Sequence, residues 1–571
     1  MTQNHTRRLS ILLMVFVLVV AAPKTSRGQA TPIQHLVVLF QENVSFDHYF
    51  GTYPYATNPS GEPAFAALPN TPRSNNLLSG GLLTNNPNST QPFRLDHAQS
   101  WTCDQNHNYA PEQKAFDHGL MDQFPQSVGT GGKSNSVECD STSTGGVWGT
   151  GLTMGYYDGN TVTALWNWAQ YYAMSDNMYG TMFGPSSPGA LQVTTGSTTG
   201  VTVCASSSDG TCTGSVGTSG KIAGGAATGV LIGDIDPLYD DCSTATSHGY
   251  ITPGMNGGNN NIGVLLSNAG TTWAWFQGGF TPTTPYNGTN TASCGHTTTG
   301  LPHIGPPSNV PSGCTYYPTN TCTGLTAETD YVSHHNPFDY IQATANPHHL
   351  PPTSGIPIGA ADPSGANHQY DLSVLSTAIA NSTSTCQLPS VSYVKQKAIG
   401  NGHPGNSDPL DEQYALVTLV NAIEKSDCWP TTAIVITYDD SDGWYDHQMD
   451  PVVNQSSSTP DDFLTDSGKC GTTPGTAPFN NPGRCGYGPR LPFIVISPYA
   501  KSNYIDHQII DQSSVVRFIE DNWLSSERIG GDSNDYKAGT LNGLFNFSEP
   551  SAARVILSPT TGEVCERIVC P

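Results

Sequence analysis

Four oxygen-bearing side chains follow two apolar runs that lie far apart in the sequence. Glu42 and Asn43 come after the first run, and Asp439 and Asp440 come after the second. The carboxyl ends of parallel strands meet at one edge of a sheet, so strands at both runs would bring the two pairs together. Three carboxylates and one amide offer the oxygen ligands that a hard or borderline divalent cation prefers. Either pair taken alone is also typical of a turn or a helix cap.

A turn punctuated by glycine and proline, residues 184–189, carries two hydroxyls, Ser186 and Ser187. A hydroxyl held exposed in such a turn can attack phosphorus when a nearby metal lowers its pKa. Serine is also a common turn former with no chemical role. The turn alone therefore leaves both interpretations open.

Short apolar runs predict the strands that would carry these groups. The runs 33–40, 432–438 and 491–497 end in polar or turn residues, as strands buried on both faces of a parallel sheet do. Helical periodicity is found at 162–173, 410–424 and 513–523. This alternation predicts an α/β fold with a central, mostly parallel sheet flanked by helices.

The segment from about 195 to 330 has a different composition. It is crowded with Gly, Thr, Ser and Asn and carries six of the 14 cysteines. We interpret it as a loop-rich, disulfide-bonded insertion that caps the core of one domain spanning residues 31–571. The aromatic cluster Trp273–Phe276 inside it is more typical of a core than of a ligand platform.

The first 30 residues read as a secretory signal peptide, with a basic start, an apolar stretch and a small-residue cleavage site. A secreted or periplasmic location follows, and the choice between general secretory and twin-arginine export stays open. In such an oxidising compartment the 14 cysteines are expected to form disulfides. Close spacing suggests the pairs Cys204/Cys212, Cys314/Cys322, Cys470/Cys485 and Cys565/Cys570.

The charge balance argues against two classes of partner, nucleic acid and anionic membranes. The chain has 21 Lys and Arg against 45 Asp and Glu, a formal net charge of −24. Such an acidic protein is not expected to bind nucleic acid or an anionic membrane. Beyond the first 30 residues, no apolar run is long enough for a stable membrane anchor.

Taken in order, the motifs resemble those of a known family. The block 41–52, QENVSFDHYFGT, looks like the opening signature of the bacterial phosphoesterases that include phospholipases C and acid phosphatases, relatives of alkaline phosphatases and sulfatases. Further matching stretches follow at Asp104–His107, Met121–Asp122, Gly184–Ser186, His334–Phe338, Gly402–Pro404 and Asp439–His447. The resemblance spans nearly the whole chain after residue 30 and implies an alkaline-phosphatase-like fold.

The resemblance also implies roles for particular residues. Ser186 would be the nucleophile that becomes phosphorylated. A divalent metal ion, its element not identified, would be held by Glu42, Asn43, Ser186, Asp439 and Asp440. The histidines that would surround the phosphoryl group are His107, His335 and His403.

One of these histidines would protonate the leaving oxygen, because phosphoryl transfer needs a proton donor as well as charge neutralisation. A proline lies directly after His403 and another lies two residues after His335. These prolines stiffen the two loops, which favours His335 and His403 as donors.

Departures from the family pattern favour one activity over another. Phospholipases C of the family usually carry Thr at the nucleophile and an Asp-Glu pair, whereas this chain has Ser186 and Asp439–Asp440. We therefore expect a secreted, metal-dependent acid phosphatase that acts on small phosphoric monoesters through a phosphoserine. A sulfatase is not expected, because Ala190 stands where its motif requires Arg.

Two alternatives remain at this point. A phospholipase C would cleave phospholipid head groups and receive the diacylglycerol on Trp273, Trp275 and Phe276. A catalytically inactive surface or glycan-binding protein would use the insertion itself. The leaving group, the metal and the oligomeric state are not specified by the sequence.

Overall fold

The computed structural model describes residues 29–100, 102–129, 150–208, 211–215, 219–251, 261–298, 314–315, 321–322, 328–472, 482–551 and 553–565. The predicted signal peptide lies outside the described residues except for its last two positions. The side chains of Cys314 and Cys322, and all of Cys570, also lie outside them.

An eight-stranded sheet forms the centre of the described structure, in the order β16-β11-β17-β1-β18-β19-β4-β20. Strand β19 is antiparallel to both of its neighbours, and the other pairings are parallel. The strands are β1 (His35–Gln41), β4 (Ala173–Ser175), β11 (Trp273–Gln277), β16 (Gln369–Asp371), β17 (Val391–Lys395), β18 (Thr432–Tyr438), β19 (Phe493–Ile496) and β20 (Tyr504–Asp506). The predicted mostly parallel sheet is confirmed.

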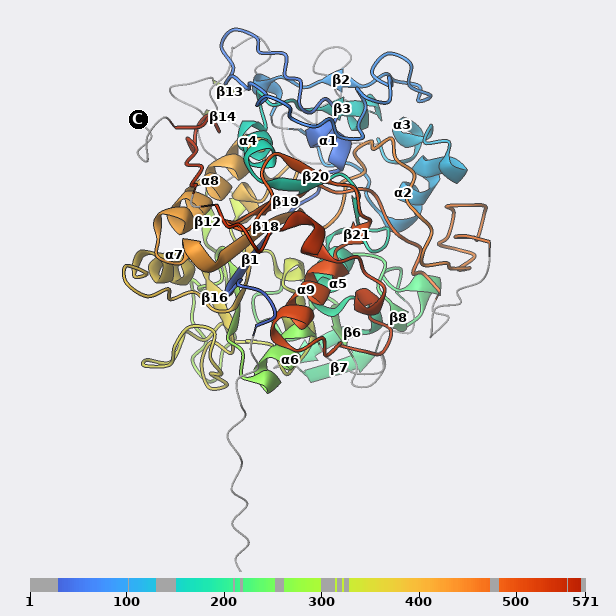
Figure 1. Cartoon of the computed structure of the whole chain (residues 1–571). Coiled ribbons are helices and arrows are strands. Elements are labelled where there is room, and N and C mark those ends of the chain that lie inside the picture. Colours follow the sequence, from blue (N-terminus) through green and yellow to red (C-terminus); the bar gives the residue numbers. More distant parts are fainter. Residues whose placement is uncertain are drawn as a thin grey trace, which may run out of the picture.

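Helices cover both faces of the sheet, because successive side chains of a buried strand point to opposite sides. Val37 and Leu39 of β1 pack in one core with α4 (Thr163–Tyr171), α7 (Leu372–Ala380) and α8 (Pro409–Lys425). Val38 and Phe40 pack in a second core with α5 (Ser186–Thr195), α6 (Ile262–Ala269) and α9 (Ser513–Trp523). Figure 1 shows the two groups of helices on opposite sides of β1 and β18. The three predicted helices correspond to α4, α8 and α9.

Local sequence explains where two of these helices begin. The Asp408 carboxylate caps α8 by accepting hydrogen bonds from the backbone N–H groups of Leu410 and Asp411, and Pro409 occupies the first turn. Helix α5 begins at Ser186, directly after a glycine and a proline, and ends at Thr195, where Gly196 caps it in a left-handed conformation.

A smaller sheet lies beside the central one. Its strands are β6 (Thr199–Ser208), β7 (Thr211–Ser215), β8 (Thr228–Val230), β9 (Asp236–Pro237) and β10 (His248–Ile251). They belong to the segment 195–330, but that segment does not lie wholly outside the central layer, because α6 and β11 belong to the main core. The loops of this segment are rich in Gly and Thr, so from the sequence the whole segment was interpreted as one insertion. The short, fully buried strand β11 was therefore not separated from it.

The aromatic cluster of β11 lies inside the protein. Trp273, Trp275 and Phe276 are completely buried. The core interpretation of this cluster is therefore confirmed, and the alternative in which these three side chains receive diacylglycerol is wrong.

Shorter elements complete the described part of the chain. Helices α1 (Phe46–Phe50), α2 (Tyr109–Phe116) and α3 (Phe124–Ser127) lie with β2 (Phe93–Arg94) and β3 (Gly155–Tyr156) in the upper part of Figure 1. The other strands form pairs: β5 (Met178–Tyr179) with β21 (Ile510–Asp511), β12 (Thr297–Thr298) with β15 (Glu328–Thr329), and β13 (Cys314–Thr315) with β14 (Thr321–Cys322).

Disulfides tie several loops together. The bridges are Cys204–Cys212, Cys242–Cys294, Cys386–Cys428 and Cys470–Cys485, and Cys103 and Cys565 are also disulfide-bonded. Two of the pairs predicted from spacing are thus confirmed, and the described residues include no free cysteine.

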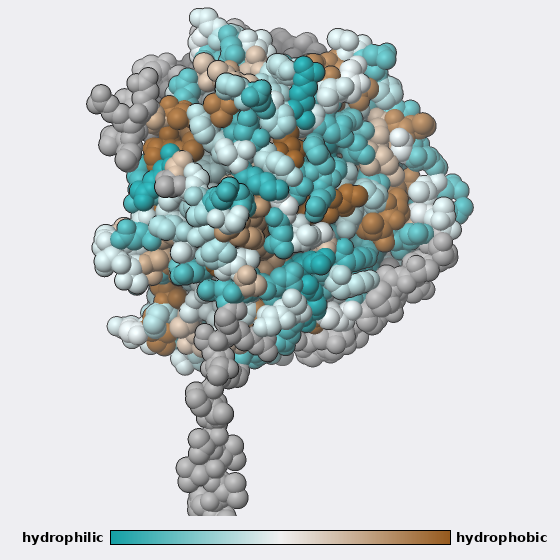
Figure 2. Space-filling model, viewed as in Figure 1, coloured by the Kyte–Doolittle hydropathy of each residue, from teal (hydrophilic) through white to brown (hydrophobic). Residues whose placement is uncertain are grey.

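The exterior is largely hydrophilic on the face seen in Figure 2, where apolar residues form small patches among polar ones. Among the helices that the structure describes, none is both long enough and apolar enough to span a membrane.

Candidate active site

The two oxygen-rich pairs meet at the carboxyl edge of the central sheet. Strands β1 and β18 are parallel neighbours with Gln41 opposite Tyr438, so the residues that follow them leave the sheet side by side. The backbone N–H of Asn43 donates to Asp439 Oδ1 at 2.9 Å. Asn43 itself has a left-handed backbone, φ 60°, which asparagine tolerates better than most residues. This turn directs Glu42 and Asn43 toward the two aspartates.

Ser186 is the first residue of α5, and its hydroxyl points into the same edge. Its Oγ lies 3.2 Å from Glu42 Oε2, 3.2 Å from Asp440 Oδ2 and 3.5 Å from Asn43 Oδ1. Ser187 faces away, because its backbone N–H donates to Asp234 and its Oγ accepts from the N–H of Ile235. The structure therefore distinguishes the two hydroxyls of the turn.

Two glycines allow this approach of α5. Gly184 has φ +118°, a conformation that side-chain-bearing residues rarely adopt. A Cβ on Gly189 would lie 2.2 Å from the backbone oxygen of Asp439, so only glycine lets α5 pack this close to the acidic loop. The glycine and proline punctuation of 184–189 thus sets the position of Ser186.

The grouped oxygens fit a divalent cation. Glu42, Asn43, Ser186, Asp439 and Asp440 are all buried. Asp439 Oδ2 accepts no hydrogen bond among the described residues, and Ser186 Oγ lies 3.2 Å from carboxylate oxygens of both Glu42 and Asp440. Such mutually repelling oxygens are stabilised by a cation among them.

Burial and mutual repulsion also alter the acidity of this group. The pKa of Glu42 is raised by burial and by the Asp439 charge, and the pKa of Asp440 is raised for the same two reasons. Bound metal would favour the ionised carboxylates, so metal uptake is expected to release protons.

A buried lysine that the sequence analysis missed completes the charge balance. Lys395 ends β17, next to β1, and its ammonium contacts Glu42 Oε1 and lies 3.9 Å from Asp439 Oδ2. Its side chain is 1% exposed. The sequence feature that could have indicated this lysine is the strand pattern of 391–395. A parallel strand that ends in Lys395 places this residue at the same edge of the sheet as Glu42.

The three predicted histidines surround this group. His335 Nδ1 lies 3.3 Å from Glu42 Oε1, and His107 Nε2 lies 3.4 Å from Asn43 Nδ2. The rings of His107 and His403 are 6.1 Å apart. All the sequence-predicted site residues are thus brought to one place.

The histidines differ in their electrostatic surroundings. Burial lowers the pKa of His335, and the neighbouring cationic groups lower it further. Burial also lowers the pKa of His403. For His107 burial opposes protonation, but the nearby carboxylates of Asp440, Asp104 and Asp442 outweigh it, and the pKa is raised well above its usual value.

Three groups that were not predicted as site residues surround one ring nitrogen of His107. Its Nδ1 forms a hydrogen bond with the backbone oxygen of Gln105 at 2.9 Å, and it lies 3.1 Å from Asp442 Oδ1 and 3.3 Å from Asp104 Oδ1. This leaves Nε2 directed toward Asn43. Asp104 and Asp442 lie inside motifs of the resemblance, but position in a motif did not indicate which residues contact the ring.

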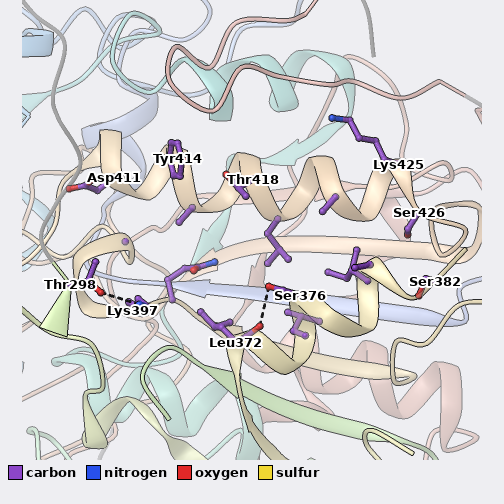
Figure 3. A pocket seen from close by; sticks show the side chains of 18 of the residues that line it. Thr298, Leu372, Ser376, Ser382, Lys397, Asp411, Tyr414, Thr418, Lys425 and Ser426 are labelled. Atoms are coloured by element: carbon purple, nitrogen blue, oxygen red, sulfur yellow. Dashed lines mark hydrogen bonds between the residues drawn. The ribbon is translucent and has the colours of Figure 1, made fainter. Parts of the chain in front are cut away.

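A separate cavity of about 870 Å³ lies between α7 and α8. Leu372, Ser376 and Tyr414 are among its lining residues, and Lys397 donates to Thr298 at one end (Figure 3). The cavity contains none of the predicted site residues. The chemistry is therefore assigned to the edge of the sheet and not to this cavity.

Comparison with known proteins agrees with these motifs. Residues 33–524 match the sequence model of the Phosphoesterase family. The chain belongs to this family. This phosphoesterase is 30% identical over 168 residues to a non-hemolytic phospholipase C of Pseudomonas aeruginosa, covering 29% of this chain and 24% of that protein. The predicted family resemblance is confirmed.

Two more distant relatives carry similar names. The phosphoesterase is 22% identical to phospholipase C A of Mycobacterium tuberculosis over 92% of this chain and 79% of that protein. It is 29% identical to non-specific phospholipase C6 of Arabidopsis thaliana over 24% of each. The match to the Pseudomonas protein spans only about a quarter of that relative's length.

Proposed function

We propose that this phosphoesterase is an exported, metal-dependent hydrolase that attacks phosphoric esters with Ser186 and prefers monoesters. The observation that carries the proposal is the position of Ser186 Oγ, 3.2 Å from carboxylate oxygens of both Glu42 and Asp440. When bound there, a divalent ion would neutralise phosphoryl charge and lower the pKa of the serine hydroxyl.

The side chains divide the reaction into two displacements. Asp440 Oδ2, 3.2 Å from Ser186 Oγ, takes the hydroxyl proton as Ser186 Oγ attacks phosphorus. The bond to the leaving oxygen breaks, and His107 gives that oxygen a proton from Nε2. A water molecule then attacks the phosphoserine and passes a proton to His107, and Asp440 returns its proton to the departing Ser186 oxygen, so all three side chains regain their starting states. His335 and His403 hold the phosphoryl oxygens from the other sides.

The choice of His107 departs from the sequence argument, which favoured His335 and His403 because of their neighbouring prolines. The backbone oxygen of Gln105 holds His107 at Nδ1 beside the carboxylates of Asp442 and Asp104, which leaves Nε2 facing the site. His335 lies instead among cationic groups, including Lys395 and His334. A proton donor must first hold its proton, which favours the histidine surrounded by carboxylates.

Phosphomonoesters are favoured over phospholipids by Ser186, by the Asp439–Asp440 pair and by the burial of the aromatic cluster once considered for lipid binding. The named relatives favour phospholipase C as the second candidate. Rates on p-nitrophenyl phosphate and phosphatidylcholine, measured on the same metal-loaded protein, separate the two. A higher kcat/KM on phosphatidylcholine would overturn the monoester preference.

Export to an oxidising compartment is part of the same proposal. The four described bridges, Cys204–Cys212, Cys242–Cys294, Cys386–Cys428 and Cys470–Cys485, support it, because disulfides persist there and are rare in reducing cytosol. Fractionation of producing cells followed by N-terminal sequencing tests it. Protein retained in the cytosol with residues 1–30 intact would contradict it.

A further inference from the structure

A buried carboxylate on α2 connects two parts of the candidate active site. Glu112 is 1% exposed. Its Oε2 accepts a hydrogen bond from the backbone N–H of Gly184 at 3.0 Å, and its Oε1 accepts one from Ser441 Oγ at 2.6 Å. Within the described residues, no Lys or Arg forms an ion pair with Glu112, and burial raises its pKa to about 7.

Each partner of Glu112 lies next to a residue that the proposed reaction uses. Gly184 is two residues before Ser186 and has the φ of +118° that shapes its turn. Ser441 directly follows Asp440, and its Oγ also accepts from the N–H of Gly443 at 3.1 Å. The carboxylate therefore joins the serine turn to the acidic loop.

Helix α2 does not need Glu112 in order to dock. Tyr109 donates to Asp462 at 2.6 Å, and Gln113 Oε1 accepts from the N–H groups of Phe463 and Leu464. These contacts hold the same helix against residues 462–464. Burial of a carboxylate that forms no ion pair with Lys or Arg is costly, and the described structure has other contacts that fix this helix.

We propose that Glu112 is a positioning residue that holds the Ser186 turn and the Asp440 loop at the separation that nucleophilic attack requires. The inference rests on the proposed function, because it assigns Glu112 a part in that reaction. It acts through Gly184 and Ser441 and contacts no reacting atom.

The variant Glu112→Gln tests this with little change in volume. An amide has one acceptor oxygen, so either the Gly184 N–H or the Ser441 hydroxyl faces an N–H group in place of a carboxylate oxygen, and the serine turn can shift. A misplacement on the order of 1 Å costs about 100-fold in rate, so we expect kcat to fall about 10- to 100-fold. The rate of Ser186 phosphorylation in acid-quenched samples should fall in parallel, while KM changes by less than about threefold.

Gln113→Ala is the matched control on the same helix. It removes contacts to Phe463 and Leu464 but none to the serine turn, so it should lower Tm and keep kcat within about twofold of wild type. An equal loss of kcat in the two variants would show that only helix docking matters and would overturn the inference. Wild-type kcat in Glu112→Gln would also overturn it.

Ser441→Ala provides a second route if Glu112→Gln folds poorly. Ser441→Ala removes the hydroxyl that donates to Glu112 Oε1. We expect a smaller loss of kcat than in Glu112→Gln, and the double variant should lose less than the two single losses combined. Unchanged kcat in Ser441→Ala would count against the inference.

Failure of the inference can be distinguished from failure of the proposed function. The inference fails and the proposed function stands if wild type is active, Ser186→Ala is inactive, and Glu112→Gln and Ser441→Ala keep wild-type kcat. Wild type without turnover on any phosphoric ester would contradict both.

Discussion

Ser186 Oγ lies 3.2 Å from Asp440 Oδ2, although 254 residues separate the two in the chain. The contact depends on two features: β18 delivers Asp440 at the carboxyl edge of the sheet, and α5 begins at Ser186 because of its glycine and proline turn. A hydroxyl next to buried carboxylates has no packing function that alanine could not fulfil. We propose that its position serves attack on phosphorus.

Removal of a carboxylate from the oxygen cluster should reduce metal content and activity together. In Asp439→Ala, a cation loses an oxygen ligand and part of its charge balance. Mutation of a group that only hydrogen-bonds to a metal ligand costs roughly 10- to 100-fold in metal affinity. We expect the loss of a direct ligand to cost at least as much. Elemental analysis and kcat on matched samples measure this. Asp466→Ala, at an exposed site, should keep both, and a fully loaded and active Asp439→Ala would remove Asp439 from the ligand set.

His107 should matter most when the leaving group is poor. An alkyl phosphate needs its leaving oxygen protonated, whereas p-nitrophenolate departs without help, so His107→Ala should slow the alkyl ester about 10²- to 10⁴-fold and the aryl ester far less. His335→Ala and His403→Ala should weaken both substrates alike. The measurement is the ratio of kcat/KM for the two esters. An unchanged ratio in His107→Ala would contradict its role as proton donor.

Glu424 should make the protein less stable as pH rises. It accepts from Tyr172 Oη at 2.9 Å and from the N–H of Val555 at 2.7 Å, and burial raises its pKa from 4.5 to about 7. The folded state therefore binds the proton more tightly than the unfolded chain, so stability is present below about pH 4.5 and is lost as pH rises to about 7. The contribution is about 3 kcal/mol.

Urea unfolding at pH 5 and pH 8 measures the effect. Glu424→Gln should show a smaller drop in the free energy of unfolding between these two pH values than wild type. Glu549→Gln, at an exposed site, should behave as wild type. An undiminished drop in Glu424→Gln would show that other buried groups cause the dependence.

The Cys386–Cys428 bridge, which closes a separation of 42 residues, should contribute about 2–4 kcal/mol to stability. Replacement of both cysteines by alanine should lower Tm without a change in kcat, because the bridge lies away from the candidate active site. Equal Tm values for the variant and wild type would contradict this.

The sequence predicted three of the eight central strands, β1, β18 and β19, and the acidic pairs that follow β1 and β18, for physical reasons that can be named. The three histidines were indicated by the family resemblance. The runs at β1 and β18 are apolar because both faces of the sheet are covered, and polar residues begin where the strands end. Lys395 and Glu112 were not predicted, because a single charged residue at the end of a short strand or inside a short helix is usually solvent-exposed. Only the three-dimensional packing shows that each meets a buried partner.

The central claim is that Ser186 carries the phosphoryl group, and a trapped intermediate tests it most directly. Wild-type protein mixed with substrate, quenched in acid and digested should show one phosphate on the peptide that contains Ser186, and fragmentation should place it on that residue. Ser186→Ala should show no phosphate and almost no turnover, with Tm close to wild type. A phosphate on Ser187, or full turnover in Ser186→Ala, would contradict the account.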